Sequence, residues 1–133
     1  MTYPKLSFQV RARSTDTLAD MAHRVAAALD CTFAPANGTE FEADEAMEAG
    51  ALGLVLHLIG EAHAQPGTEV TYVLRGLVRP DVEAQLDLDA STISISEYVL
   101  GVLRLLDNDG WYIADRAELL TEAGLPMDDA PSG

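Results

Sequence analysis

The chain has 133 residues, 48% of them apolar, and a formal net charge of -14 at pH 7. This length fits one domain, and the apolar content is enough for one hydrophobic core without disulfides or metal. So strong a negative charge disfavours binding to nucleic acid or anionic membrane and favours a basic partner. We expect a single domain over residues 1–125 and a disordered tail over residues 126–133.

The cysteine content and the hydropathy pattern indicate the cellular compartment in which the protein is expected to fold. Cys31 is the single cysteine, so no internal disulfide can form, and the first residues do not resemble a signal peptide. The longest apolar run, residues 49–56, is too short to cross a bilayer. These features predict a soluble protein of a reducing cytoplasm.

The first third of the chain predicts a strand, a helix and a hairpin. Residues 7–13 alternate between apolar and polar side chains, as in a half-buried strand. Residues 18–29 carry apolar side chains at helical spacing after a Ser/Thr/Asp cluster that supplies an N-cap.

Asn37-Gly38 favours a hairpin between residues 31–36 and residues 39–43. A three-residue loop would pair Phe33 with Phe41 and set the carboxylates of the second strand on the outer face. Pro35 then marks an edge strand, because proline cannot donate a hydrogen bond to a ladder. Residues 44–49 are compatible with either a strand or one helical turn, and we leave both open.

The second half of the chain predicts two strands, two helices and a short extended segment. Residues 52–58 place four leucines on one side of a strand that is also apolar on its other side, which is typical of a central strand. The β-branched run that follows Pro66-Gly67 would pair with it antiparallel. Residues 81–89 read as a loop, followed by a helix to Leu106 with Gly101 in its middle, an extended segment at 111–113 and a short helix at 115–123.

Together these elements predict an α+β fold. We expect an antiparallel sheet of four to five strands, two principal helices packed against it and a short C-terminal helix. Gly101 costs about 1 kcal/mol relative to alanine in a helix, so it marks either a close approach to the sheet or a tolerated defect.

The carboxylates predict the binding surface. Residues 25–74 contain no lysine or arginine, and the acidic run starts just after Asn37-Gly38. We expect a primary acidic surface made by Glu40, Glu42, Asp44, Glu45 and Glu48. A secondary acidic patch in the 81–89 loop would contain Asp81, Glu83, Asp87 and Asp89. An aromatic anchor would be made by Trp111 and Tyr112. Two alternatives stay open: an acidic surface that is only solvated, and core packing of the aromatic pair, which is the commoner role.

No residue pattern predicts catalysis, a metal or another cofactor. His57, Glu61 and His63 share one side of a strand, but the histidines would lie roughly 20 Å apart, too far to share one ion. Cys31 has no evident base beside it and is expected to be a buried structural thiol. We therefore predict a protein that is not an enzyme, with any chemical role of the two histidines left open.

A compact acidic chain of this length, with Asn37-Gly38 leading into the carboxylates of residues 40–48 and no catalytic motif, resembles the immunity proteins of bacterial polymorphic-toxin systems. The resemblance is one of type and spans the chain. It implies a protein that binds a basic cognate toxin, such as a nuclease, and occludes its active site. The alternatives are a secretion chaperone, a nucleic-acid-mimic inhibitor, and a small hydrolase that uses His57 or His63 with a carboxylate.

Overall fold

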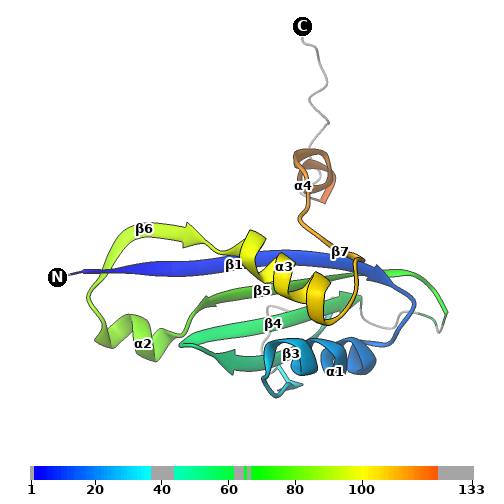
Figure 1. Cartoon of the computed structure of the whole chain (residues 1–133), viewed down its shortest axis with the longest axis horizontal. Helices are drawn as coiled ribbons and strands as arrows, with labels where there is room; N and C mark the ends of the chain where they lie inside the picture. Colours follow the sequence, from blue (N-terminus) through cyan, green and yellow to red (C-terminus); the bar gives the residue numbers. More distant parts are fainter. Residues whose placement is uncertain (1, 37–43, 62–64, 66, 123–133) are drawn as a thin grey trace, which may run out of the picture.

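A computed structural model describes residues 2–36, 44–61, 65 and 67–122. Within these residues the fold is α+β, with one mixed sheet and four helices (Figure 1). The strands are β1 (Tyr3–Ser14), β2 (Ala34–Pro35), β3 (Asp44–Ala51), β4 (Leu54–Glu61), β5 (Val70–Val78), β6 (Leu88–Ser94) and β7 (Trp111–Tyr112). The helices are α1 (Leu18–Leu29), α2 (Pro80–Gln85), α3 (Ser96–Leu106) and α4 (Arg116–Glu122).

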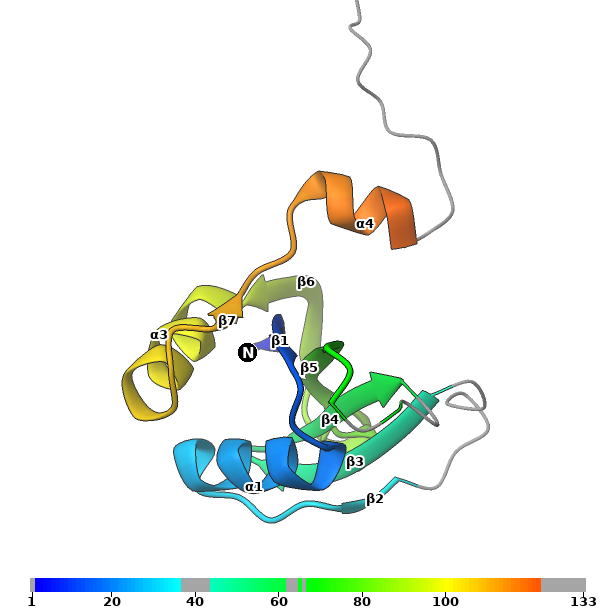
Figure 2. The same ribbon diagram turned by 90° about the vertical axis from the view of Figure 1, so that its right-hand side faces the viewer.

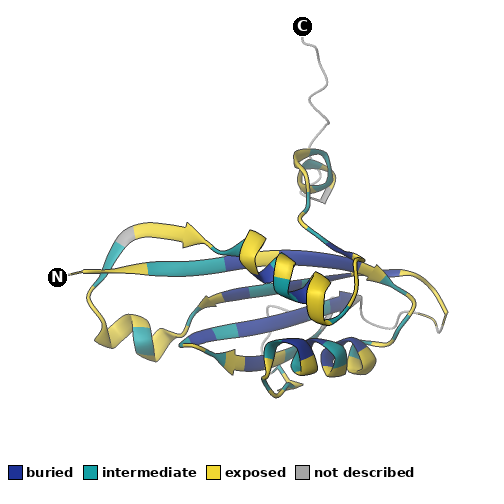
Figure 3. Ribbon diagram, in the orientation of Figure 1, coloured by how far each residue is buried: buried dark blue, intermediate teal, exposed yellow. Residues whose placement is uncertain are grey.

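The core lies between one face of the sheet and the helices α1 and α3. Figure 2 shows both helices on the same side of the sheet, and Figure 3 shows that the buried residues follow the strands beneath them. On β1, Phe8, Val10 and Ala12 are buried and Gln9 and Arg13 are exposed, as the alternation predicts, but Arg11 on the polar side is buried as well. We call this the helix face and the opposite side the outer face.

Helix α1 forms where its sequence predicts. The Thr17 hydroxyl accepts a hydrogen bond from the Asp20 amide at 3.1 Å, which satisfies one of the free amides of the first turn. Met21 and Val25 are fully buried one turn apart and face the sheet. Burial of each such side chain contributes about 1.5–3 kcal/mol, which fixes the helix to the sheet.

The sheet is mixed and has seven described strands, which corrects the expectation of an antiparallel sheet of four to five strands. The strand order is β2-β3-β4-β5-β1-β6, and β7 also pairs with β1. Strand β1 runs antiparallel to β5 and β7 but parallel to β6. The reason is that α2 carries the chain past the end of β1, so that β6 starts beside Tyr3 and runs in the same direction (Figure 1).

The predicted hairpin partner of residues 31–36 is wrong. In β2, Ala34 pairs with Glu48 and Pro35 with Met47, so its neighbour is β3. Met47 and Ala49 supply the apolar side of β3, and this favours the strand over a helical turn for that segment. Pro35 does lie on an edge strand, as predicted. The Asn37-Gly38 turn and the Phe33–Phe41 pair involve residues 37–43, which lie outside the described residues.

A tight turn joins β3 and β4, and it corrects the predicted place of Leu52. Leu52 and Gly53 have φ values of 53° and 76°, as a hairpin with two left-handed central residues requires. Leu52 is 96% exposed, not part of the apolar strand side. The central position of β4 and its antiparallel pairing with β5 are confirmed.

Residues 81–89 are not a loop. They contain most of α2, where Pro80 occupies the first turn, and the beginning of β6. In α3, nothing lies within 4 Å of the Cβ position of Gly101, so this glycine does not mark a close approach to the sheet. Among the described helices, none is both long enough and apolar enough to span a bilayer.

Candidate functional site

A row of polar side chains crosses the outer face of the sheet. The strand register places Gln9 opposite Arg75, Arg75 opposite His57, and His57 opposite Glu48. His57 Nε2 lies 3.2 Å from Glu48 Oε1, and His57 is only 8% exposed. The row therefore links the acidic strand β3 to the middle of the sheet.

The neighbours of this row explain why His57 is buried. Val55 and Ile59 flank it on β4, and Val73 and Leu77 lie opposite them on β5. His57 thus lies among apolar side chains on a strand with two apolar sides. Its contact with the exposed carboxylate of Glu48 gives the ring a polar partner, which is the usual requirement for a buried imidazole.

The metal hypothesis finds no support in the described residues, which contain no group of three His, Cys, Asp or Glu side chains able to hold an ion. Glu61 ends β4 opposite Asp44. His63 lies outside the described residues. Among the described residues, the Glu48 carboxylate lies beside the His57 ring.

Arg11, Tyr112 and Glu118 join α4 to the outer face of β1. Arg11 Nη1 donates to Glu118 Oε2 at 2.9 Å, and the Tyr112 hydroxyl donates to the same oxygen at 2.9 Å. Arg13 lies over the Tyr112 ring at 4.8 Å from its centroid. Burial, and then the hydrogen bond to Glu118, raise the pKa of Tyr112. Tyr112 is therefore half-buried and engaged within the chain.

Trp111 is fully buried, so its predicted role as an exposed anchor is wrong. Its Nε1 donates to Asp107 Oδ2 at 2.7 Å, which places the ring in the core beside α3. Core packing, the commoner role for such a residue, is what the structure shows. Sequence reasoning missed the partner, although an acidic residue four positions before the tryptophan was a visible signal.

Arg24 connects α1 to this same carboxylate. Its Nε and Nη2 donate to the two oxygens of Asp107 at 3.0 and 2.7 Å, and its Nη1 donates to Asp16 at 2.7 Å. The hydrogen bonds from Arg24, and next the one from Trp111, hold the pKa of Asp107 below its usual value. Such a bidentate pair is geometrically specific and ties α1 to the end of α3.

The carboxylates predicted for the primary acidic surface are only partly described. Asp44, Glu45 and Glu48 lie on β3, whereas Glu40 and Glu42 lie outside the described residues. The strand register places the backbone of Asp44 opposite that of Glu61.

The secondary patch is partly neutralised by the chain itself. Asp81 binds Arg79 at 2.6 Å and Glu83 binds Lys5 at 3.3 Å. The hydrogen bond from Arg79 lowers the pKa of Asp81. Asp89 accepts a hydrogen bond from the Ser91 amide, and Asp87 is exposed. Only part of this patch is therefore available to a partner.

All eight basic residues have interactions within the chain. Five form ion pairs with carboxylates of the chain: Lys5, Arg11, Arg13, Arg24 and Arg79. Arg104 donates a hydrogen bond to the Trp111 carbonyl. The other two, Arg75 and Arg116, have further interactions. The net charge of -14 already counts these eight cations, so the remaining carboxylates have no matching cation in the chain.

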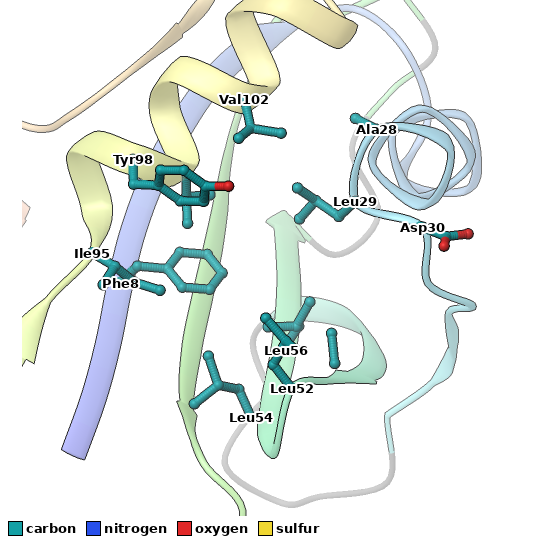
Figure 4. A pocket seen from close by; sticks show the side chains of 12 residues that line it. Phe8, Ala28, Leu29, Asp30, Leu52, Leu54, Leu56, Ile95, Tyr98 and Val102 are labelled. Atoms are coloured by element: carbon teal, nitrogen blue, oxygen red, sulfur yellow. The ribbon is translucent and has the colours of Figure 1, made fainter. Parts of the chain in front are cut away.

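An apolar cavity of about 250 Å³ lies between α1, α3 and the sheet. Figure 4 shows Tyr98 and Val102 of α3 across from Leu29 of α1, with Leu54 and Leu56 below them. Its lining contains a single carboxylate, Asp30, and no histidine or cysteine. The cavity offers apolar contact and no general acid–base pair.

A second cavity of about 300 Å³ includes His23 and Cys31, which the sequence did not lead us to expect in one place. The thiol is half-buried. Burial, and next the charge of Asp30, raise the pKa of Cys31, so the neutral thiol is favoured over the nucleophilic thiolate. This arrangement does not favour nucleophilic catalysis.

No protein-family model matches the chain, and no curated protein or solved structure matches it either. The fold and the composition define the chain as an α+β domain with a large excess of carboxylates.

Proposed function

We propose that the chain is a non-catalytic binding protein for a basic protein partner, of the immunity-protein type. The partner would be a cationic toxin such as a nuclease, and the acidic segment of residues 40–48 would cover its substrate groove. The observation that carries this proposal is the large excess of carboxylates over basic residues, six of which already bind carboxylates or a carbonyl of the chain itself through their side chains. A surface with that charge balance needs its cations from another molecule.

The register of β3 supports the choice of surface. Asp44 lies opposite Glu61, and Glu48 is exposed at the end of the polar row. An exposed carboxylate such as that of Glu48 can form an ion pair with a cationic side chain of the partner, which is what the proposal requires. Lysine and arginine side chains around a nucleic-acid-binding groove would meet this requirement.

Electrostatic attraction of this kind acts mainly on the rate of association. Opposed fields steer the two proteins together and disfavour partners of the wrong charge. Because exposed charges are screened over about 8 Å at physiological ionic strength, the association rate should fall steeply as salt is added.

Charge reversal tests the proposal. The tagged protein is used to recover partners from an extract of its native host, and recovered proteins are identified by mass spectrometry. The test variant is Glu42→Lys with Glu45→Lys. The control is Glu69→Lys with Asp109→Lys, which changes the net charge equally at exposed positions elsewhere.

We expect a basic protein to be recovered by the wild type and by the control, and to be lost with the test variant. The association rate of the purified pair should drop at least tenfold in the test variant at low salt. Recovery of no basic protein, or equal loss in both variants, contradicts the proposal.

A further inference from the structure

The two edges of the sheet differ in how they are protected against pairing. At one edge, β2 has two residues and one of them is Pro35, and the adjacent β3 carries acidic residues. Short strands, proline and charges are the devices that prevent an edge from adding another strand. At the other edge, β6 has seven residues and no described strand on its outer side. From Ser91 to Ser96 this edge carries no charge and no proline.

The parallel register shows which main-chain groups of β6 remain open. Ser7 lies opposite Ser94, and the Ile95 amide donates to the Ser7 carbonyl at 2.8 Å. Main-chain groups of successive strand residues point alternately to the two sides. Ile93 therefore directs its amide and carbonyl to β1, whereas Thr92 and Ser94 direct theirs to the outer edge.

We propose that β6 pairs with β6 of a second copy of this chain, antiparallel and with the two-fold axis at Ile93. In this register Thr92 lies opposite the partner's Ser94, and the reverse, so the open groups of both strands form about four hydrogen bonds. Ile93 is 49% exposed and meets its own counterpart in a pair whose Cα atoms are about 4.5 Å apart. The sheet then continues across the axis.

We assign the strand that pairs with β6 to a second copy of this chain because the outer edge of β6 is uncharged from Ser91 to Ser96. A basic strand would find no carboxylate along Ser91 to Ser96, whereas an acidic copy can approach only where carboxylates are absent. The nearest ones, Asp89 and Glu97, lie at the two ends of the pairing. Their repulsion is screened by salt, so this association strengthens as salt is added. Binding of a basic partner has the opposite salt dependence, which separates the two proposals.

Sedimentation equilibrium of the full chain provides the test. A single strand pair buries far less than the roughly 1,600 Å² of a standard interface, so we expect a dissociation constant on the order of 100 µM. It should fall several-fold between about 0.05 and about 0.5 M sodium chloride. A chain that stays monomeric at about 1 mM in the higher salt overturns the proposal.

Charge pairing at the axis tests the register. Ile93→Glu alone and Ile93→Lys alone should each be monomeric, because like charges then face each other, whereas an equimolar mixture should form a heterodimer. Recovery in the mixture also shows that both variants are folded. Leu105→Glu, at an 82% exposed position on α3, should leave the dimer unchanged. A mixture that stays monomeric, or a dimer that is lost only with Leu105→Glu, overturns the proposal.

Thr92→Pro provides a second, independent variant. The amide that it removes points to the outer edge, so the ladder to β1 is preserved. Each dimer loses two hydrogen bonds, and we expect about thirtyfold weaker association with an unchanged far-ultraviolet spectrum. A folded Thr92→Pro protein that dimerises as the wild type does would overturn the proposed edge.

Discussion

Replacement of Asp107 by alanine should remove the link between the two principal helices. In the folded protein this carboxylate accepts two hydrogen bonds from Arg24 and one from Trp111. Its side chain is 12% exposed and that of Arg24 is 23% exposed, so water cannot fully replace these bonds. The indole N–H of the buried Trp111 would lose its acceptor.

The magnitude follows from these contacts. Hydrogen bonds to charged groups contribute about 1.5–3 kcal/mol, and an unsatisfied buried donor costs about 1–3 kcal/mol. Arg24 keeps its bond to Asp16 at 2.7 Å, which limits the loss. We expect Asp107→Ala to lower the free energy of unfolding by about 3 kcal/mol, equivalent to a fall in Tm of about 10 °C.

Urea unfolding provides the measurement, because Trp111 is the only tryptophan and its fluorescence reports on this site. Circular dichroism of the helices gives a second probe of the same transition. The control is Asp109→Ala, an exposed aspartate two residues away, with an expected change within about 0.5 kcal/mol. Equal effects of the two substitutions, or no effect of either, would refute the role assigned to Asp107.

The same carboxylate should contribute to acid sensitivity. Its pKa is lowered on folding, chiefly by the hydrogen bonds from Arg24, so its stabilisation is present above the unfolded pKa of about 3.9. This stabilisation is lost as the pH falls through the lower pKa of the folded state. The difference in stability between wild type and Asp107→Asn should therefore be full at pH 7 and shrink toward zero in strong acid. A difference that is independent of pH would contradict this account.

Three further predictions concern stability and are read from urea midpoints. Gly76→Ala should lower the free energy of unfolding by about 2–3 kcal/mol, because the new Cβ would overlap the Phe8 ring. Gly101→Ala should raise it by about 1 kcal/mol, because nothing lies near the Cβ position and alanine favours helix. Effects of the same sign would contradict this prediction. Leu52→Asn should stabilise by about 1 kcal/mol, because asparagine tolerates positive φ and only exposed leucine is lost; a loss of stability would contradict it. Glu118→Gln should cost about 2 kcal/mol and speed amide exchange in α4, since a buried arginine loses its carboxylate; unchanged exchange would contradict it.

Local features of the fold could be predicted from the sequence. Helix α1 follows from apolar spacing and the Thr17 cap, which act within a few residues. The antiparallel pairing of β4 with β5 follows from two apolar runs and one turn. The strand prediction wrongly included Leu52, because the alternation of apolar residues carries no information on the positive φ at which the backbone turns.

Long-range features could not be predicted. The parallel pairing of β6 with β1 joins Leu6 to Ile93, and no local pattern in a short run of serine and threonine predicts that partner. For the candidate site, the Arg79–Asp81 pair is two residues apart and is visible in the sequence. The Lys5–Glu83 pair spans 78 positions and appears only when the fold brings its members together. The partition of carboxylates into paired and available groups therefore required the structure.

The central place of β1 has a consequence for synthesis. Strand β1 is synthesised before the strands it pairs with: Phe8 pairs with Gly76, Leu6 with Ile93 and Ala12 with Trp111. Contacts of such long sequence separation make folding slow, and β1 has its full set of neighbours only after Trp111 has been made. Pulling-force measurements on stalled nascent chains should therefore show the largest tension from folding only after Trp111 has emerged, when β1 can pair with β5, β6 and β7 together.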